Sequence, residues 1–204
     1  MFDPELANYI YENPVIAVVV IDNLEDALPT ANALVEGGIK VIELALRTEA
    51  SFDALLIINE EVPEMLVGAG TVITPQQVRA LSVASIRFAV SPGTNYNVLS
   101  AAKDCGLSFA PGIATPSDIE TALSFDAKIL KFFPAEPIGS VKYLNSITAP
   151  YAHLGLKFIP LGGLTYDNFD QYLSNKHVLA IGGSWIASRT LINSENWKQI
   201  TKSA

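Results

Sequence analysis

The sequence predicts an α/β fold, a TIM (β/α)8 barrel with an extra N-terminal helix, and three observations support this prediction. Eight apolar, β-branched segments recur along the 204 residues. Amphipathic stretches long enough for two or three helical turns separate them, and no Ser/Gly-rich linker divides the chain. A doubly wound open sheet is the structural alternative, but eight strands in so short a chain favour closure. Residues 1–204 are therefore expected to form one domain.

The predicted strands and helices alternate along the chain. The strand segments are VIAVVVI (15–21), KVIELAL (40–46), EMLVGAGTV (64–72), IRFAVSPG (86–93), LSFAPG (107–112), AKILKFFPA (127–135), LKFIPLGG (156–163) and HVLAIGGSW (177–185). The helical stretches include LEDALPTANALVEGG (24–38), TPQQVRALSVAS (74–85) and NYNVLSAAKDCG (95–106). Several of these end in glycine, the usual helix stop. Residues 2–12 are expected to form the extra helix, which would cover the bottom of the barrel.

The composition argues against several classes of function. Half of the residues are hydrophobic and the net charge is −8. Nucleic acid is an unsuitable ligand for such a chain, because its phosphates require a basic face. An anionic substrate stays compatible, because a few local donors can outweigh the global charge. The single cysteine, Cys105, cannot form an internal disulfide and fits a reducing compartment, where we expect it to pack within a helix.

The first residues lack a basic leader followed by an apolar core, so they do not resemble a signal peptide. The longest apolar run, VIAVVVI, is too short to span a membrane. We therefore expect a soluble cytoplasmic protein that does not bind a membrane.

The unusual residues gather where the predicted strands end. The segments finish in GAGT, SPGT, APG, FPAE, PLGG and GGSW. Active sites of (β/α)8 barrels lie at the C-terminal ends of the strands, so this pattern predicts a ligand face there. For any single segment, a turn after the strand explains the Gly and Pro residues better. The six segments together favour a ligand site.

Side-chain alternation along the strands predicts which residues point into the barrel. Glu43 and Arg47 share one strand face, with Arg47 nearer the mouth. By the same alternation Lys131 and Phe133 point into the lumen. A structural salt bridge between Glu43 and Lys131 is one interpretation, although buried ion pairs are costly relative to apolar packing.

These residues also predict imine chemistry. Desolvation favours the neutral form of an amine, and a neutral amine such as that of Lys131 attacks carbonyls. The resulting iminium is an electron sink, and Glu43 would move protons at the adjacent carbon. Arg47 offers the planar fork that suits the carboxylate of a 2-oxo acid. The two histidines, His153 and His177, cannot cluster at this site, so no metal and no cofactor is expected.

Two Gly-Gly pairs follow the last two predicted strands. Gly162 and Gly163 lie in PLGG, and Gly182, Gly183 and Ser184 lie in IGGSW. Barrels of this type usually place a phosphate after these strands, on backbone N–H groups that glycine leaves accessible. The pattern therefore predicts a phosphorylated ligand.

Together these motifs resemble a known family. VIELALRTE, VGAGTVITPQQ, FAVSPGTN, LKFFPAE, PLGG and IGGSW occur in the order seen in 2-keto-3-deoxy-6-phosphogluconate (KDPG) aldolase, also called 4-hydroxy-2-oxoglutarate (KHG) aldolase. The resemblance spans nearly the whole chain. It implies a metal-free class I (Schiff-base) aldolase on a TIM barrel, usually a homotrimer. Such an enzyme is a lyase that splits KDPG into pyruvate and glyceraldehyde 3-phosphate in the Entner–Doudoroff pathway of carbohydrate metabolism.

The resemblance also implies roles for the residues nearest the reaction. It makes Lys131 the Schiff-base lysine and Glu43 the general acid and base. Arg47 and Thr71 would bind the pyruvate carboxylate. For Thr71, strand-end packing is the alternative interpretation.

Other positions would shape the pocket and hold the distal end of the substrate. The resemblance implies that Pro92 and Phe133 form the pocket wall, although strand-end packing is again the alternative for both. Gly162, Gly163 and Ser184 would hold the distal phosphate.

Two residues depart from the family pattern. The family commonly has PTGG after the seventh strand, with the threonine touching substrate, whereas Leu161 stands here. After the first strand many members carry a basic residue, whereas this chain has Asp22 and Asn23. Both departures leave the imine chemistry intact and concern recognition of the distal part of the substrate.

Several other functions are compatible with these residues. Cleavage of KHG, cleavage of the phosphogalactonate epimer and decarboxylation of oxaloacetate all use the same pyruvyl imine. A phosphosugar isomerase or epimerase would instead use Glu43 for proton transfer and Lys131 only for its charge. A catalytically silent phosphometabolite-binding protein is a third class. Borohydride trapping with pyruvate separates the imine-forming reactions from the other two classes.

Overall fold

The computed structural model describes residues 1–204 and shows an α/β protein built on parallel strands. The strands are β1 (Val15–Val19), β2 (Val41–Ala45), β3 (Leu66–Gly70), β4 (Phe88–Val90), β5 (Ser108–Ala110), β6 (Gly112–Ile113), β7 (Ile129–Phe132), β8 (Lys157–Pro160) and β9 (Ile181–Gly183). Each of them overlaps one of the eight predicted segments.

The strands form two curled parallel sheets rather than the single continuous barrel that the sequence predicts. One sheet has the order β5-β4-β3-β2-β1-β9 and the other β6-β7-β8. The fifth predicted segment is divided at Pro111, which lacks the N–H that a continuous ladder needs. Its carbonyl still accepts a hydrogen bond from Lys131 N at 2.9 Å, so the sheets adjoin there. At their other edges they are linked by two isolated bridges, Phe158–Val178 and Leu161–Gly182.

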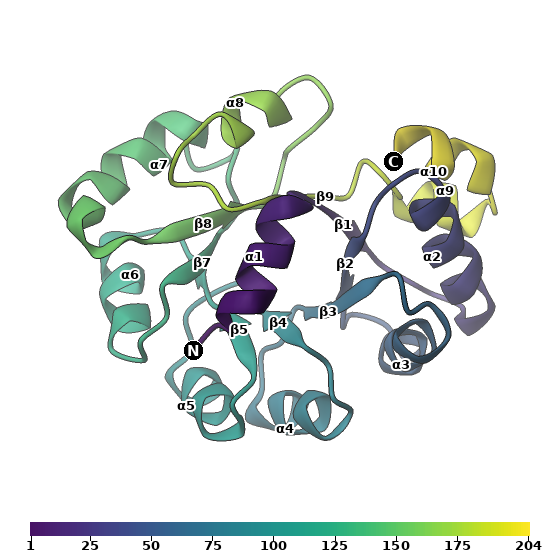
Figure 1. Ribbon diagram of the computed structural model, residues 1–204, viewed down its shortest axis with the longest axis horizontal. Coiled ribbons are helices and arrows are strands. Elements are labelled where there is room, and N and C mark those ends of the chain that lie inside the picture. Colours follow the sequence, from purple (N-terminus) through teal and green to yellow (C-terminus); the bar gives the residue numbers. More distant parts are fainter.

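All the helices except the first, which lies across one end of the strands, surround the strands on the outside (Figure 1). The helices are α1 (Pro4–Glu12), α2 (Ala27–Glu36), α3 (Ser51–Glu61), α4 (Pro75–Val83), α5 (Tyr96–Cys105), α6 (Pro116–Leu123), α7 (Ser140–Thr148), α8 (Phe169–Leu173), α9 (Arg189–Asn193) and α10 (Trp197–Ser203). Two 3-10 turns, η1 (Leu24–Asp26) and η2 (Ala149–Leu154), complete the elements. None of the helices has both the length and the apolar character needed to cross a lipid bilayer.

Local sequence signals set the ends of several helices. Thr74 and Gln77 form a capping box before α4, and Thr115 and Asp118 form another before α6. In each pair the two side chains satisfy backbone N–H groups that the first turn leaves unpaired. Helix α5 ends at Gly106, whose φ of +66° is the left-handed conformation that glycine adopts without strain.

The buried side chains separate into layers that follow strand alternation. Val41 of β2 and Ile129 of β7 belong to an apolar cluster in the lumen. Their sequence neighbours Ile42 and Leu130 belong to two other clusters, which contain buried residues of the surrounding helices. The predicted inward and outward faces of these two strands are therefore confirmed.

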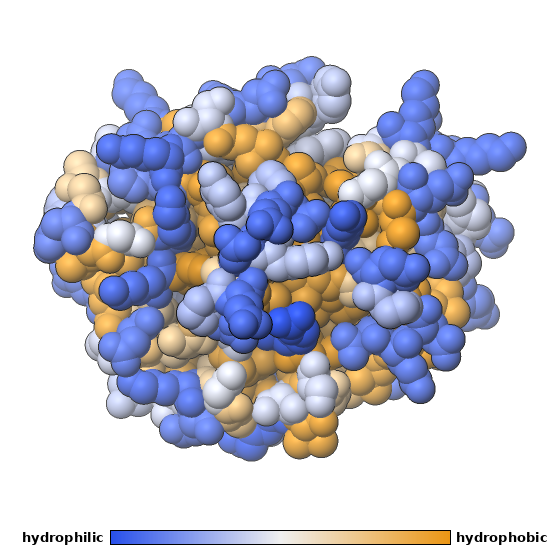
Figure 2. All heavy atoms as spheres, in the orientation of Figure 1, coloured by the Kyte–Doolittle hydropathy of each residue, from blue (hydrophilic) through white to orange (hydrophobic).

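Helix α1 lies across one end of the strands (Figure 1). It begins after Asp3, whose side chain accepts hydrogen bonds from the N–H groups of Glu5 and Leu6. Leu6 and Ile10, one turn apart, are fully buried in the lumen cluster. Hydrophilic residues cover the outward side of the helix, with hydrophobic residues beside it (Figure 2). One amphipathic face thus covers the bottom of the lumen.

Candidate active site

Lys131 and Glu43 meet inside the lumen. They are the third residues of β7 and β2, which belong to different sheets. Lys131 Nζ donates to Glu43 Oε1 at 2.9 Å, and the two residues are only 4% and 1% exposed. An amine and a carboxylate in direct contact and shielded from water can exchange a proton without an intermediary. This is the arrangement that a lysine nucleophile with its own general base requires.

Gly70 on β3 makes room for the carboxylate, and the sequence reasoning did not single it out. A Cβ at position 70 would lie 2.2 Å from Glu43 Oε1, so any side chain would displace the carboxylate. Gly68, two residues earlier, leaves room in the same way for the ring of Phe88. Both glycines lie on the inward face of β3, and their spacing of two in VGAGT is the signal that could have identified them.

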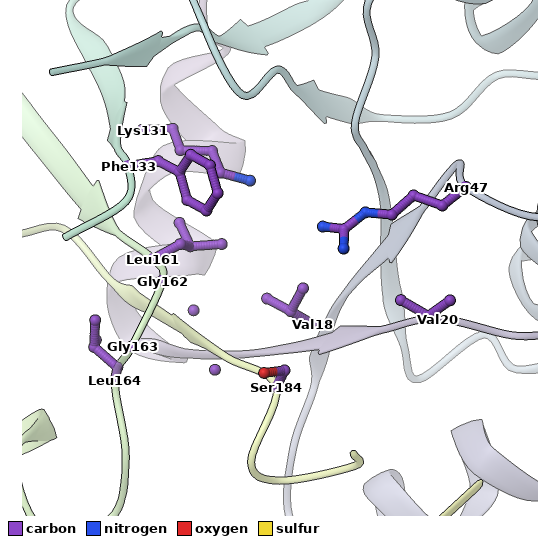
Figure 3. A pocket seen from close by; sticks show the side chains of 12 residues that line it. Val18, Val20, Arg47, Lys131, Phe133, Leu161, Gly162, Gly163, Leu164 and Ser184 are labelled. Atoms are coloured by element: carbon purple, nitrogen blue, oxygen red, sulfur yellow. The ribbon is translucent and has the colours of Figure 1, made fainter. Parts of the chain in front are cut away.

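A cavity of about 220 Å³ lies at the C-terminal ends of the strands (Figure 3). Lys131 and Phe133 stand on one side, and the guanidinium of Arg47 points toward them from the other (Figure 3). The lining residues are Val18, Val20, Arg47, Lys131, Phe133, Leu161, Gly162, Gly163, Leu164, Gly182, Gly183 and Ser184. The structure thus brings together most of the residues that the sequence predicts for the site.

Arg47 is held by Thr71. Arg47 Nε donates to Thr71 Oγ1 at 3.1 Å, while neither Nη group has an acceptor within the protein. Thr71 has a φ of +59°, a left-handed conformation that is rare for a β-branched residue. Such a conformation persists only where the surrounding structure imposes it. With only Nε engaged, the two Nη groups of Arg47 are free to donate two hydrogen bonds to a carboxylate.

Phe133 covers the amine from the side. Its ring centroid lies 5.2 Å from Lys131 Nζ. The ring face attracts a cation and, when the amine is neutral, provides an apolar wall. The ring of Phe133 is therefore compatible with both the protonated and the neutral amine of Lys131.

The loop after β8 has its carbonyls turned away from the cavity. The carbonyl of Leu161 accepts from Ala135 N at 2.8 Å, and that of Gly162 accepts from Glu136 N at 3.0 Å. In a trans peptide the next N–H points opposite to the carbonyl. The N–H groups of Gly162 and Gly163 therefore point away from the β7 loop; that of Gly162 is turned toward Gly182 by the Leu161–Gly182 bridge, and that of Gly163 has no acceptor within the protein. A free backbone N–H group at a cavity can bind an anion.

A family model described as KDPG and KHG aldolase matches residues 6–203. The chain belongs to the KDPG and KHG aldolase family. The KHG/KDPG aldolase of Escherichia coli is 43% identical over 191 residues, which cover 94% of this chain and 89% of that protein. Membership makes this chain an aldolase and hence a lyase.

Two solved structures of KDPG aldolases resemble this one closely. That from Legionella pneumophila, with pyruvate captured at low pH as a covalent carbinolamine intermediate, is 39% identical, with a TM-score of 0.91 and coverage of 97% of this chain and 95% of that one. That from Zymomonas mobilis with 3-phosphoglycerate is 34% identical, with a TM-score of 0.86 and coverage of 97% and 95%.

Not every predicted site residue of this aldolase lines the cavity. Thr71 reaches it only through Arg47, and Ser184 lines it and is exposed. Pro92 is exposed, does not line the cavity, and has its carbonyl packed against Gly112. The role of Pro92 as a pocket wall stays a prediction.

The two departures from the family pattern differ in their surroundings. Leu161 lines the cavity and is 3% exposed. Asp22 does not line the cavity. Its carboxylate accepts two hydrogen bonds from Arg189, at 2.6 and 2.7 Å, and one from Asn193. These bonds lower the pKa of Asp22 to about 2. Arg189 therefore balances the charge of Asp22, which stands where many family members carry a basic residue.

Proposed function

We propose that this chain is a class I aldolase that cleaves KDPG or KHG to pyruvate and an aldehyde through an imine on Lys131. The observation that carries the proposal is the buried contact of 2.9 Å between Lys131 Nζ and Glu43 Oε1 beneath the cavity. A base in direct contact with the amine can remove the proton that the amine must lose before it attacks a carbonyl. The chain has a net charge of −8, yet Arg47 and Lys131 provide cationic groups at this cavity.

The reaction begins at the C2 carbonyl of the substrate. Lys131 Nζ forms a bond to C2, and the carbinolamine hydroxyl leaves as water with a proton from Glu43. Glu43 then accepts the proton of the C4 hydroxyl while the C3–C4 bond breaks. The electron pair of the C3–C4 bond passes to the imine nitrogen. The aldehyde departs, Glu43 returns the proton to C3 of the enamine, and water hydrolyses the imine to release pyruvate.

The two ends of the substrate would be held by different groups. Arg47, oriented by Thr71, binds the carboxylate next to C2. The loop of Gly162 and Gly163 and the hydroxyl of Ser184 bind the distal phosphate. The relatives support a ligand with a pyruvyl end and a phosphate, because one solved structure contains pyruvate as a covalent carbinolamine and the other 3-phosphoglycerate.

The proposal extends to the architecture. Residues 1–204 would form one domain in which the isolated bridges close the two sheets into a complete (β/α)8 barrel behind the N-terminal helix. The resemblance to the family supports a homotrimer, and the single cysteine fits the cytoplasm. Sedimentation equilibrium of the purified protein tests the trimer directly.

Borohydride trapping tests the mechanism. Pyruvate plus borohydride is expected to add a stable mass to one peptide, the one containing Lys131, and Lys131→Ala is expected to abolish both the adduct and cleavage. Lys128→Ala is the matched control, because Lys128 precedes the same strand and is exposed. An adduct on another lysine, or none on the wild-type protein, would overturn the mechanism.

A further inference from the structure

Three consecutive peptide groups form the loop after β8. The carbonyls of Leu161, Gly162 and Gly163 all accept hydrogen bonds, the last from Asn168 Nδ2 at 3.2 Å. The N–H groups that follow them point away from these contacts: that of Gly162 is turned toward Gly182 by the parallel Leu161–Gly182 bridge, and those of Gly163 and Leu164 have no acceptor within the protein. They belong to Gly162, Gly163 and Leu164, which all line the cavity. The direction of each N–H group depends on the group that holds the preceding carbonyl.

Among the residues that hold these carbonyls, Glu136 contacts the loop through both its backbone and its side chain. Its backbone N–H holds the Gly162 carbonyl, and its side chain lies directly against Gly163. A Cβ at position 163 would lie 2.6 Å from Glu136 Cβ, and Gly163 has a φ of +85°. Only glycine accepts both this contact and this conformation. The position of the Glu136 side chain thus sets the place of the loop.

Tyr172 fixes that side chain from the outside. Its hydroxyl donates a hydrogen bond to Glu136 Oε1, and the residue is fully buried in α8. Burial and the neighbouring carboxylate both raise the pKa of the Tyr172 phenol, so the hydroxyl keeps its proton at any working pH. The bond also keeps the charge of Glu136 turned toward α8 rather than toward the cavity.

We infer that Glu136 and Tyr172 are positioning residues that set the preference of this aldolase for a phosphorylated substrate. They hold the peptide between Gly162 and Gly163, whose N–H group belongs to Gly163, and they keep a carboxylate turned away from the anion that this loop binds. They touch neither Lys131 nor Glu43, so the imine step does not depend on them. The inference rests on the proposed function, because it assumes that the Gly162–Gly163 loop receives the phosphate.

The test compares a substrate with a phosphate and one without. Tyr172→Phe removes only the hydroxyl, and we expect KM for KDPG and Ki for inorganic phosphate to rise together by roughly three- to thirtyfold. The kcat/KM for KHG and the rate of pyruvate trapping at Lys131 should stay within about twofold, because these need no distal phosphate. Glu136→Gln keeps an acceptor for Tyr172 without the charge, and should keep the wild-type Ki for phosphate within about twofold.

Tyr151→Phe is the matched control. Tyr151 also donates its hydroxyl to a glutamate, Glu120, at 2.9 Å, but this pair lies outside the cavity. Its removal should leave all four measurements unchanged. Should Tyr172→Phe not fold, Asn168→Ala removes a different support of the same loop and should raise the Ki for phosphate alone.

The outcomes separate the inference from the proposed function. If Tyr172→Phe leaves Ki and KM unchanged, or lowers KHG turnover as much as KDPG turnover, the positioning role is refuted while the mechanism stands. The same holds if Glu136→Gln weakens phosphate binding as much as Tyr172→Phe does. If wild-type protein traps no pyruvate, the proposed function itself is refuted.

Discussion

Lys131 and Glu43 are each other's counter-charge in a lumen otherwise filled mainly by apolar side chains. Removing two charges from water is expensive, and replacement of such a pair by well-packed apolar residues is often neutral or stabilising. Stability therefore gives no reason for a chain to keep this pair. The proposed mechanism does, because it gives the amine and the carboxylate separate tasks in imine formation and cleavage.

Glu43→Gln separates these two tasks. Glutamine keeps the shape and an acceptor for Lys131 but cannot carry a proton, so turnover should fall by about 10²–10⁴-fold. Borohydride trapping of pyruvate should fall much less, because Lys131 is still present. The measurement is the ratio of the kcat change to the trapping-rate change, with Glu60→Gln on the exposed side of α3 as the control. A fall in kcat of less than about tenfold would assign proton transfer to another group.

At the scale of elements, the site depends on how neighbouring strand ends fit together. Leu161, after β8, occupies the space that a side chain on β9 would take, since a Cβ at Gly182 would lie 2.5 Å from Leu161 Cδ2. The absence of a side chain at Gly182 on β9 thus leaves room for the side chain of Leu161. This residue, rather than one with a hydroxyl, then faces the cavity.

Leu161→Thr should therefore sharpen the choice of substrate. The hydroxyl can bond to a substrate hydroxyl, and one such bond corresponds to about a three- to tenfold change in specificity. We expect the ratio of kcat/KM for KDPG to that for its C4 epimer to move by this factor, while pyruvate trapping at Lys131 is unchanged. Leu161→Val, which shortens the side chain without adding a hydroxyl, is the control. An equal change in both variants would assign the effect to space and not to hydrogen bonding.

At the scale of the whole molecule, the two ends of the lumen have different tasks. The C-terminal strand ends carry the cavity, whereas α1 covers the other end with Leu6 and Ile10. In (β/α)8 barrels, the architecture that we propose for this chain, residues at the bottom contribute stability and residues at the top contribute chemistry. A large change at the bottom should therefore leave catalysis intact as long as the chain stays folded.

Ile10→Ala tests this division. Removal of a fully buried isoleucine side chain should lower the free energy of unfolding by about 2–5 kcal/mol. Below the unfolding transition, kcat/KM should stay within about twofold, because the Lys131–Glu43 contact lies toward the other end. Denaturant unfolding and steady-state kinetics provide the two measurements, with Val83→Ala, at an 87% exposed position, as the control. A loss of kcat/KM that parallels the loss of stability would contradict the division.

Much of the fold and of the site is encoded locally. Alternation along KVIELAL and AKILKFFPA was enough to place Glu43 and Lys131 on inward faces, because the side-chain period of a strand is two wherever the strand lies. Caps such as Thr74 and the glycine stop at Gly106 likewise act within a few residues. The Gly162–Gly163 motif after β8 could likewise be predicted to lie in a loop with accessible N–H groups, because it too is a local signal.

Tertiary structure alone decided which groups meet. Asp22 and Arg189, 167 positions apart, neutralise each other, and nothing in the residues around Asp22 indicated that partner. The contact of Gly70 with Glu43 and the support of Gly163 by Glu136 and Tyr172 also join different elements. Such contacts depend on how strands and helices pack at fixed distances in three dimensions. Local sequence sets the direction in which a side chain points, whereas packing determines what lies in its path.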